Sequence, residues 1–187
     1  MDQDRKRICP VERAGHLDMK IRRWFQDPRK ILAPYVKAGM TVLDYGCGPG
    51  FFTLDLAEMV GRSGRVIAAD LQKGMLEKLK EKMQGTDWEG RIRLHQCAES
   101  RIGLSEPVDF VLCFYMVHEI PDQAAFFREL HGILQPEGKV LIAEPPVHVS
   151  KAAFDRMIAR ARAENLVPVE RPRVFLSKAV VLKRDQS

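Results

Sequence analysis

The chain has 187 residues, enough for one domain of ordinary size. Hydrophobic residues make up 45% and charged residues 29% of it, which is typical of a globular protein and excludes a disordered or membrane-embedded chain. Its apolar stretches fall well short of the roughly 20 residues that a membrane-spanning helix needs. Residues 1–7 lack the apolar core of a signal peptide, so we expect a cytoplasmic protein.

Charge and cysteine usage exclude further classes of site. The formal net charge is +5, but Lys and Arg are interleaved with Asp and Glu, which favours a solvated surface over a basic nucleic-acid stripe. Cys9, Cys47, Cys97 and Cys113 are widely separated and form no Cys-x-x-Cys pair. Their spacing indicates reduced thiols rather than a zinc site or a disulfide framework.

Helix and strand patterns alternate from residue 28 onward, which predicts an α/β fold, a doubly wound and mostly parallel sheet with helices on both faces. Asp27 and Pro28 form an N-cap and a first helical position. Pro136-Glu137-Gly138 is expected to be a turn. Helices are expected over residues 28–37, 51–60, 73–83, 122–134 and 150–164, and strands over 41–44, 66–70, 92–96, 108–114 and 139–144.

Two more apolar segments close the chain, over residues 167–175 and 178–183. Their closeness predicts an antiparallel hairpin at the sheet edge, because a parallel crossover needs a dozen or more residues. We therefore expect one domain over residues 28–187, preceded by a lid or cap segment over residues 1–27.

The most informative segment is Val42-Leu43-Asp44-Tyr45-Gly46-Cys47-Gly48-Pro49-Gly50. It places three glycines where a buried strand turns into a helix, so backbone amides can approach a ligand closely. Asp70 ends the next strand about 20 residues later, where an acidic side chain can bind both hydroxyls of a ribose. The alternative is that the glycines only shape a turn and Asp70 caps the next helix.

The loop Gly46-Cys47-Gly48-Pro49-Gly50 is one residue shorter than the dinucleotide fingerprint Gly-x-Gly-x-x-Gly. With Asp70, it resembles the S-adenosylmethionine site of class I methyltransferases, particularly the small-molecule group that includes ubiquinone and menaquinone biosynthesis enzymes. Over residues 30–183, the order of the predicted helices and strands also resembles that of the family. The resemblance implies a seven-stranded Rossmann-like fold, S-adenosylmethionine as cofactor with S-adenosylhomocysteine as product, and in-line methyl transfer to a small-molecule acceptor.

The resemblance also assigns residues to the cofactor. It implies that the methionine part is surrounded by Asp44, Gly46, Cys47, Gly48 and Gly50, that the ribose is bound by Asp70, and that Leu71 lies against the adenine. At the end of the third strand, where the family usually has an acidic residue followed by alanine, this chain has Cys97-Ala98-Glu99. Cys97 departs from the pattern, the Ala98 N–H is a candidate adenine contact, and Glu99 either supplies the missing carboxylate or is simply solvated. Phe114 and Tyr115 correspond to the point where the chain passes the cofactor's amino-acid moiety, or they only pack.

His118 is the candidate catalytic base, because it follows the fourth strand and ligands of open α/β sheets sit beyond the carboxyl ends of the strands. Glu119 is the candidate residue to orient it, and Glu144 is a weaker acid or base candidate. A structural or substrate-shaping role for His118 is the alternative. In the N-terminal segment, His16, Arg22, Arg23 and Trp24 are candidate lid residues over the acceptor, or part of a helix packed on the sheet edge.

Other functions stay open at this point. A nucleic-acid methyltransferase would be expected to carry an Asn/Asp-Pro-Pro-aromatic motif after the fourth strand, where this chain has Phe114-Tyr115-Met116-Val117. A metalloid acceptor would require Cys9, Cys47 and Cys97 to approach one another. A protein acceptor, a non-catalytic binding protein and an NADH-dependent oxidoreductase are further alternatives. The sequence does not identify the acceptor, the atom methylated or the oligomeric state.

Overall fold

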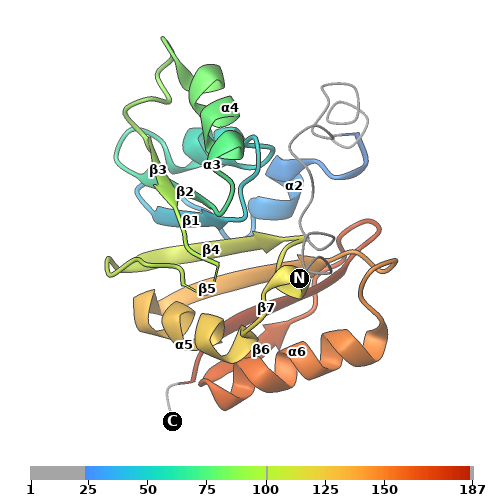
Figure 1. The fold of residues 1–187 in the computed structure, drawn as a ribbon. Helices are drawn as coiled ribbons and strands as arrows, with labels where there is room; N and C mark the ends of the chain where they lie inside the picture. Colours follow the sequence, from blue (N-terminus) through green and yellow to red (C-terminus); the bar gives the residue numbers. More distant parts are fainter. Residues whose placement is uncertain (1–23, 100, 186–187) are drawn as a thin grey trace, which may run out of the picture.

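The structure is a computed structural model that describes residues 24–99 and 101–185, and its centre is one seven-stranded sheet (Figure 1). The strand order is β3-β2-β1-β4-β5-β7-β6. Strands β1 to β5 pair in parallel, whereas β7 pairs antiparallel with both β5 and β6. The predicted fold class, with its antiparallel edge hairpin, is therefore confirmed. The strands are β1 (Thr41–Tyr45), β2 (Arg65–Asp70), β3 (Ile92–Gln96), β4 (Val108–Phe114), β5 (Leu134–Glu144), β6 (Leu166–Glu170) and β7 (Lys178–Arg184).

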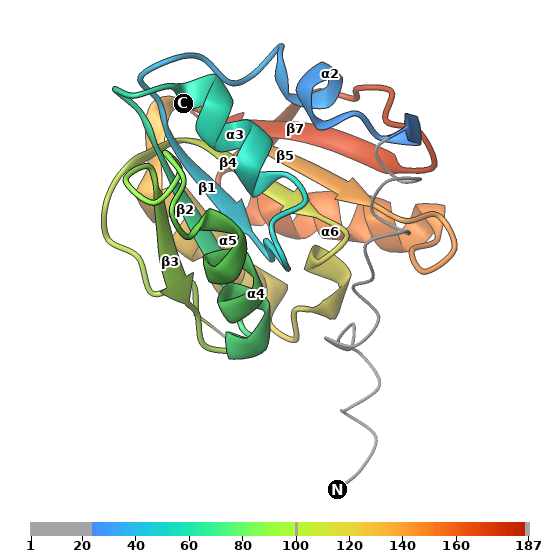
Figure 2. The same cartoon turned by 90° about the horizontal axis from the view of Figure 1, so that it is seen from above.

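Helices cover both faces of the sheet: α2, α3 and α4 on one, α5 and α6 on the other (Figure 1). Helix α3 lies over β1 and β2, and α4 over β2 and β3 (Figure 2). The central strands β1 and β4 are buried on both faces, which explains their nearly unbroken apolar sequences. No helix in the described part of the chain is long and apolar enough to cross a bilayer. The helices are α2 (Pro28–Leu32), α3 (Thr53–Val60), α4 (Lys73–Met83), the 3₁₀ turn η3 (Val117–Glu119), α5 (Gln123–Ile133) and α6 (Lys151–Ala163).

Helix α2 is shorter than the expected 28–37 and ends at Leu32. Pro34 follows two residues later, and proline has no N–H to continue the helical ladder, so the helix stops there. Helix α3 likewise begins at Thr53 rather than residue 51, because the turn out of the glycine loop takes up Phe51 and Phe52.

Two strand boundaries differ from the prediction by more than one residue. Strand β5 begins at Leu134, and Pro136-Glu137-Gly138 lies inside it instead of forming a separate turn. The pairing moves from Val108 with Leu134 to Phe110 with Lys139, so these residues form a bulge opposite β4. Strand β6 ends at Glu170 rather than reaching residue 175, because Pro172 follows and cannot donate to the ladder.

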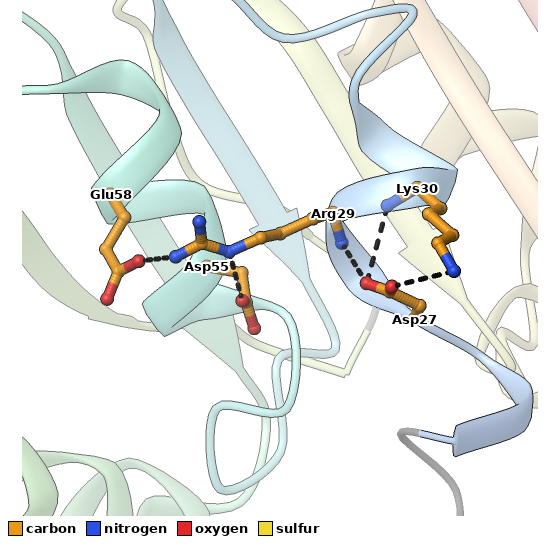
Figure 3. Close-up of polar contacts among 5 residues, drawn as sticks. All are labelled: Asp27, Arg29, Lys30, Asp55 and Glu58. Carbon is orange, nitrogen blue, oxygen red and sulfur yellow. Dashed lines mark hydrogen bonds and ion pairs between the residues drawn. The ribbon is translucent and has the colours of Figure 1, made fainter.

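The start of α2 is fixed by its cap and by ion pairs to α3 (Figure 3). The Asp27 carboxylate accepts hydrogen bonds from the backbone N–H groups of Arg29 and Lys30, as expected of an N-cap. The Arg29 guanidinium pairs with Asp55 and Glu58 on α3. The entry of the chain into the domain is thereby attached to the helix that follows the glycine loop.

Candidate functional site

The glycine loop (residues 46–50) joins β1 to α3 and is fastened to β2 beside it. The backbone N–H groups of Gly46 and Cys47 both donate to the carbonyl of Ala69, at 2.8 and 3.0 Å. Gly46 and Gly50 have φ values of 75° and 86°, in the left-handed region that favours glycine. The backbone conformation of the loop thus favours glycine at positions 46 and 50.

The three glycines of the loop face different surroundings. A Cβ atom on Gly46 would come within 2.8 Å of Met116, and one on Gly50 within 2.5 Å of Leu79 Cδ1. A Cβ atom on Gly48, whose φ is 53°, would meet no atom within 4 Å. Packing therefore requires the outer two glycines, whereas Gly48 borders open space that a ligand can enter.

Asp70, the last residue of β2, is connected directly to this loop. Its side chain is largely buried and accepts the Gly48 N–H at 2.9 Å on one oxygen and the Gln72 N–H at 2.8 Å on the other. Burial raises the pKa of the carboxyl group, and the hydrogen bonds from backbone N–H groups lower it. The structure thus brings together the two features that the sequence analysis paired, the glycine loop and the acid on β2.

Two further hydrogen bonds, one buried and one half-buried, stabilise the loop and the strand before it, and the sequence analysis missed both. The Thr53 hydroxyl donates to the buried carboxylate of Asp44 at 2.6 Å. The Lys82 ammonium group on α4 donates to the Pro49 carbonyl at 2.5 Å. The only sequence signal for the first contact is a hydroxyl residue at the start of the helix, and the second depends on tertiary packing.

The residues expected beside an adenine come directly after β2, at Leu71, and after β3, at Cys97, Ala98 and Glu99. Leu71 is partly buried, and Cys97 is buried. The Ala98 N–H donates to the Arg101 carbonyl, so it would have to exchange that partner to reach a ligand. Glu99 is exposed. A nearby hollow of about 520 Å³, between the loop after β3 and α5, is lined by none of the predicted site residues.

The end of β4 carries aromatic side chains and a strained backbone. Phe114 is buried with its ring 4.5 Å from that of Tyr115, and Tyr115 has a φ of 61°, which is costly for a non-glycine residue. The Tyr115 hydroxyl accepts a hydrogen bond from Gln26 at 2.6 Å and lies 2.7 Å from the Ser177 hydroxyl and 3.0 Å from the Leu176 carbonyl. Tyr115 therefore joins the segment before α2 to the turn before β7.

His118 is held by Glu144 rather than by the expected Glu119. Its ring Nδ1 lies 2.5 Å from Glu144 Oε2, and its backbone N–H donates to Oε1 of the same fully buried carboxylate. The hydrogen bond to Glu144 raises the pKa of His118, and burial opposes it. Burial raises the pKa of Glu119 to about 7; the neighbouring His118 opposes this rise, and Glu144 and Asp70 add smaller increases.

The structure offers no support for a metalloid site. Burial raises the pKa of the Cys47 and Cys97 thiols, which opposes the thiolate form that binds soft metals. No group of three or more His, Cys, Asp or Glu side chains within residues 24–99 and 101–185 could hold a metal ion. Cys9, His16, Arg22 and Arg23 lie outside the described residues, and Trp24 is largely exposed.

The strand order, the glycine loop and the acid on β2 define an α/β domain of the class that binds nucleosides at the carboxyl ends of its strands. The sequence profile of a family described as "Methyltransferase domain" matches residues 36–170. The chain therefore belongs to this family of methyltransferase domains.

Individual relatives agree with this assignment. The chain is 34% identical to a demethylmenaquinone methyltransferase of Lactobacillus johnsonii over 110 residues, 58% of this chain and 45% of the relative. It is 29% identical to a ubiquinone/menaquinone biosynthesis C-methyltransferase of Enterobacter sp. over 124 residues, 64% of this chain and 49% of the relative. The chain thus spans about half the length of these curated relatives.

A similar solved structure covers nearly the whole chain. The crystal structure of a SAM-dependent methyltransferase from Aquifex aeolicus matches with a TM-score of 0.83 at 26% identity, over 94% of this chain and 98% of that one. The described fold is therefore that of a methyltransferase of similar size.

Proposed function

We propose that the chain is an S-adenosylmethionine-dependent methyltransferase acting on a small-molecule acceptor. The observation that carries the proposal is the open space at Gly48, with the carboxylate of Asp70 on the same backbone N–H. A cradle of this kind leaves room for a ligand and offers a carboxylate to its ribose. The names of the quinone-biosynthesis relatives and of the Aquifex aeolicus structure support the cofactor and the acceptor class.

The residues around this cradle would hold the cofactor. Asp70 would bind the ribose, with Leu71 against the adenine and Cys97, Ala98 and Glu99 at its far edge. The methionine part would contact Phe114 and the loop residues Asp44, Gly46, Cys47, Gly48 and Gly50. S-adenosylmethionine supplies an electrophilic methyl group to a suitably placed acceptor, and the protein mainly has to hold that acceptor in line and exclude water.

The described cysteines, Cys47, Cys97 and Cys113, are free and buried. Free thiols support the further proposal that the protein works in a reducing compartment, the cytoplasm.

Calorimetric titration with S-adenosylmethionine, S-adenosylhomocysteine and NADH in parallel tests the proposed function. We expect the two adenosyl compounds to bind and NADH not to bind. Binding of NADH alone, or of none of the three, would refute the proposal. Binding of the adenosyl compounds without methyl transfer to any acceptor would instead indicate a binding protein.

A further inference from the structure

Most of the exposed large apolar side chains lie at one edge of the sheet. Among the described residues, six such side chains are exposed, and five of them come from three segments: the start of the described chain, the loop after β5 and the turn before β7. Both views show these three segments at the same edge (Figure 1, Figure 2). We call the five residues the apolar patch: Trp24, Phe25, Val147, Phe175 and Leu176.

Contacts between its segments hold the apolar patch in place. The ring of Phe25 stacks on that of Phe175 with 5.2 Å between centroids, and the ring of Trp24 lies 5.0 Å from that of Phe25. The side-chain amide of Gln26 donates to the Phe175 carbonyl at 2.9 Å. The ammonium group of the first residue of β7 donates to the Val149 carbonyl at 2.8 Å, which ties β7 to the loop after β5. The three segments therefore form one surface.

Leu176 lies where neither the backbone nor packing accounts for a leucine. Its φ of 50° is in the left-handed region, which disfavours any residue with a side chain of this size. Its side chain is 65% exposed, so burial within the domain does not offset that strain. Trp24 and Val147 are more exposed still, at 83% and 89%. Exposed apolar side chains that gather in this way mark a surface that binds something outside the chain.

Positive charge gathers at the same edge. Residues 24–30, 145–151 and 170–178 together hold six Lys and Arg but only two Asp and Glu, an excess of four in a chain whose formal net charge is +5. Some of these basic side chains pair with carboxylates on α3 and α6. Among the described residues, no ion pair is made by Arg173, which is exposed, or by Lys178. The charge around the apolar patch therefore suits a partner with a negatively charged surface.

The side chains of the patch fit a lipid surface better than a nucleic acid. A single strand binds by stacking its bases on free aromatic faces, but the rings of Phe25 and Phe175 stack on each other. Val147 and Leu176 are aliphatic and cannot stack. Aromatic and aliphatic side chains flanked by Lys and Arg are instead typical of proteins that bind at the boundary between lipid headgroups and acyl chains.

We propose that the apolar patch binds the protein peripherally to the surface of a bilayer that contains anionic lipids. Trp24, Val147 and Leu176 enter the boundary between headgroups and acyl chains, and Arg173 lies against the lipid phosphates. Binding is reversible, because a few side chains bury little apolar area and the attraction between charges is screened by salt. Binding to a bilayer requires no cofactor, so it is tested separately from the proposed function.

Tryptophan fluorescence tests which part of the molecule enters the bilayer. The chain has two tryptophans, Trp24 in the patch and Trp88 after α4. Trp88→Phe leaves Trp24 as the only emitter, and Trp24→Phe leaves Trp88 as the matched control. With vesicles of equimolar phosphatidylglycerol and phosphatidylcholine, we expect the Trp24 emission to shift to shorter wavelength and to be quenched by brominated acyl chains, and the Trp88 emission to stay unchanged.

Vesicle sedimentation of the full chain tests the apolar side chains. The variant is Trp24→Ser with Leu176→Asn, since asparagine tolerates the left-handed backbone and a loss of folding is not expected. We expect its partition coefficient to fall by about tenfold or more. Val169→Ser is the matched control, because Val169 is the sixth exposed apolar side chain and lies on β6, outside the patch.

Sedimentation also tests the charges. Arg173→Gln is expected to weaken binding by about fivefold, whereas Lys80→Gln on α4 leaves it unchanged. Vesicles of phosphatidylcholine alone are expected to bind the wild type more weakly, and added salt to weaken its binding to the anionic vesicles.

Four results would overturn the proposal. They are no binding of the wild type to the anionic vesicles, equal binding to both kinds of vesicle, equal binding of the double variant and Val169→Ser, and quenching of Trp88 instead of Trp24. Binding of a single-stranded oligouridylate without binding to vesicles would assign the patch to a nucleic acid instead. Self-association that the double variant abolishes, again without binding to vesicles, would assign it to a second copy of the chain.

Discussion

Replacing Gly48 and Gly50 by alanine separates the ligand-facing part of the glycine loop from its packed part. Gly48→Ala introduces a side chain at a φ of 53° with no atom within 4 Å, so only the left-handed backbone cost of about 1–2 kcal/mol applies. Gly50→Ala has a φ of 86° and places its Cβ 2.5 Å from Leu79 Cδ1. Overpacking adds about 1–3 kcal/mol there.

These magnitudes translate into different melting temperatures and affinities. We expect Gly48→Ala to lower the Tm by about 2–8 °C and Gly50→Ala by about 4–20 °C, at about 2–4 °C per kcal/mol for a domain of this size. The added methyl group of Gly48→Ala occupies the open space of the cradle. We therefore expect it to weaken S-adenosylmethionine binding by about tenfold or more, or about 1.4 kcal/mol.

Gly85→Ala is the matched control for Gly48→Ala. Gly85 has a φ of 72° and no atom within 4 Å of an added Cβ, but it follows α4 and is not part of the glycine loop. Scanning calorimetry and titration calorimetry on all three variants complete the comparison. If Gly48→Ala binds S-adenosylmethionine as tightly as Gly85→Ala does, the ligand does not occupy the space at Gly48 and the reasoning is refuted.

Three further substitutions test other contacts. Asp70→Asn is expected to weaken S-adenosylmethionine binding about tenfold or more and to lower the Tm of the ligand-free protein. The reason is that an amide is a poorer acceptor for the N–H groups of Gly48 and Gln72. An unchanged dissociation constant in calorimetry would contradict the ribose role. The pKa of Glu119 is raised to about 7, so the folded state binds this proton more tightly than the unfolded state does. The contribution of the Glu119 carboxyl group to stability is therefore present at pH 4 and is lost as the pH rises through 7. Glu119→Gln, measured by thermal unfolding, is therefore expected to gain about 2–4 °C over the wild type at pH 8 and nothing at pH 4, after allowance for solvent screening; equal shifts at both pH values would exclude this titration. Asp27→Ala removes the cap of α2 and is expected to cost about 0.5–2 kcal/mol in urea unfolding; no loss would show that the ion pairs to α3 hold the helix alone.

The order of elements could be predicted because each depends on local periodicity. Helix α4 and strands β3 and β4 have the predicted bounds, and the edge hairpin followed from the short connection between its strands. The prediction of a separate turn was wrong where the local sequence fits two different structures. Pro136-Glu137-Gly138 suits a turn and a bulge equally well, and only the pairing of β4 with β5 decides between them.

The candidate site was predictable where its residues follow one another in sequence. The glycine loop and Asp70 could be found from spacing, since both end adjacent strands. Glu144 was expected only as a weak candidate, because its partner His118 lies 26 residues away in the chain. The neighbour Glu119 seemed the simpler choice, but β4 and β5 lie side by side and bring Glu144 under the ring.

Tyr115 connects two segments that lie far apart in the sequence, the residues before α2 and the turn before β7. Its hydroxyl is hydrogen-bonded to Gln26 before α2 and to Leu176 and Ser177 before β7, from the end of the central strand β4. Segments tied through one atom open cooperatively, because breaking either contact weakens the other. Amide hydrogen exchange at Gln26 and at Ser177 is therefore expected to report the same opening free energy. The segment before α2 and the turn before β7 would then open together as one unit.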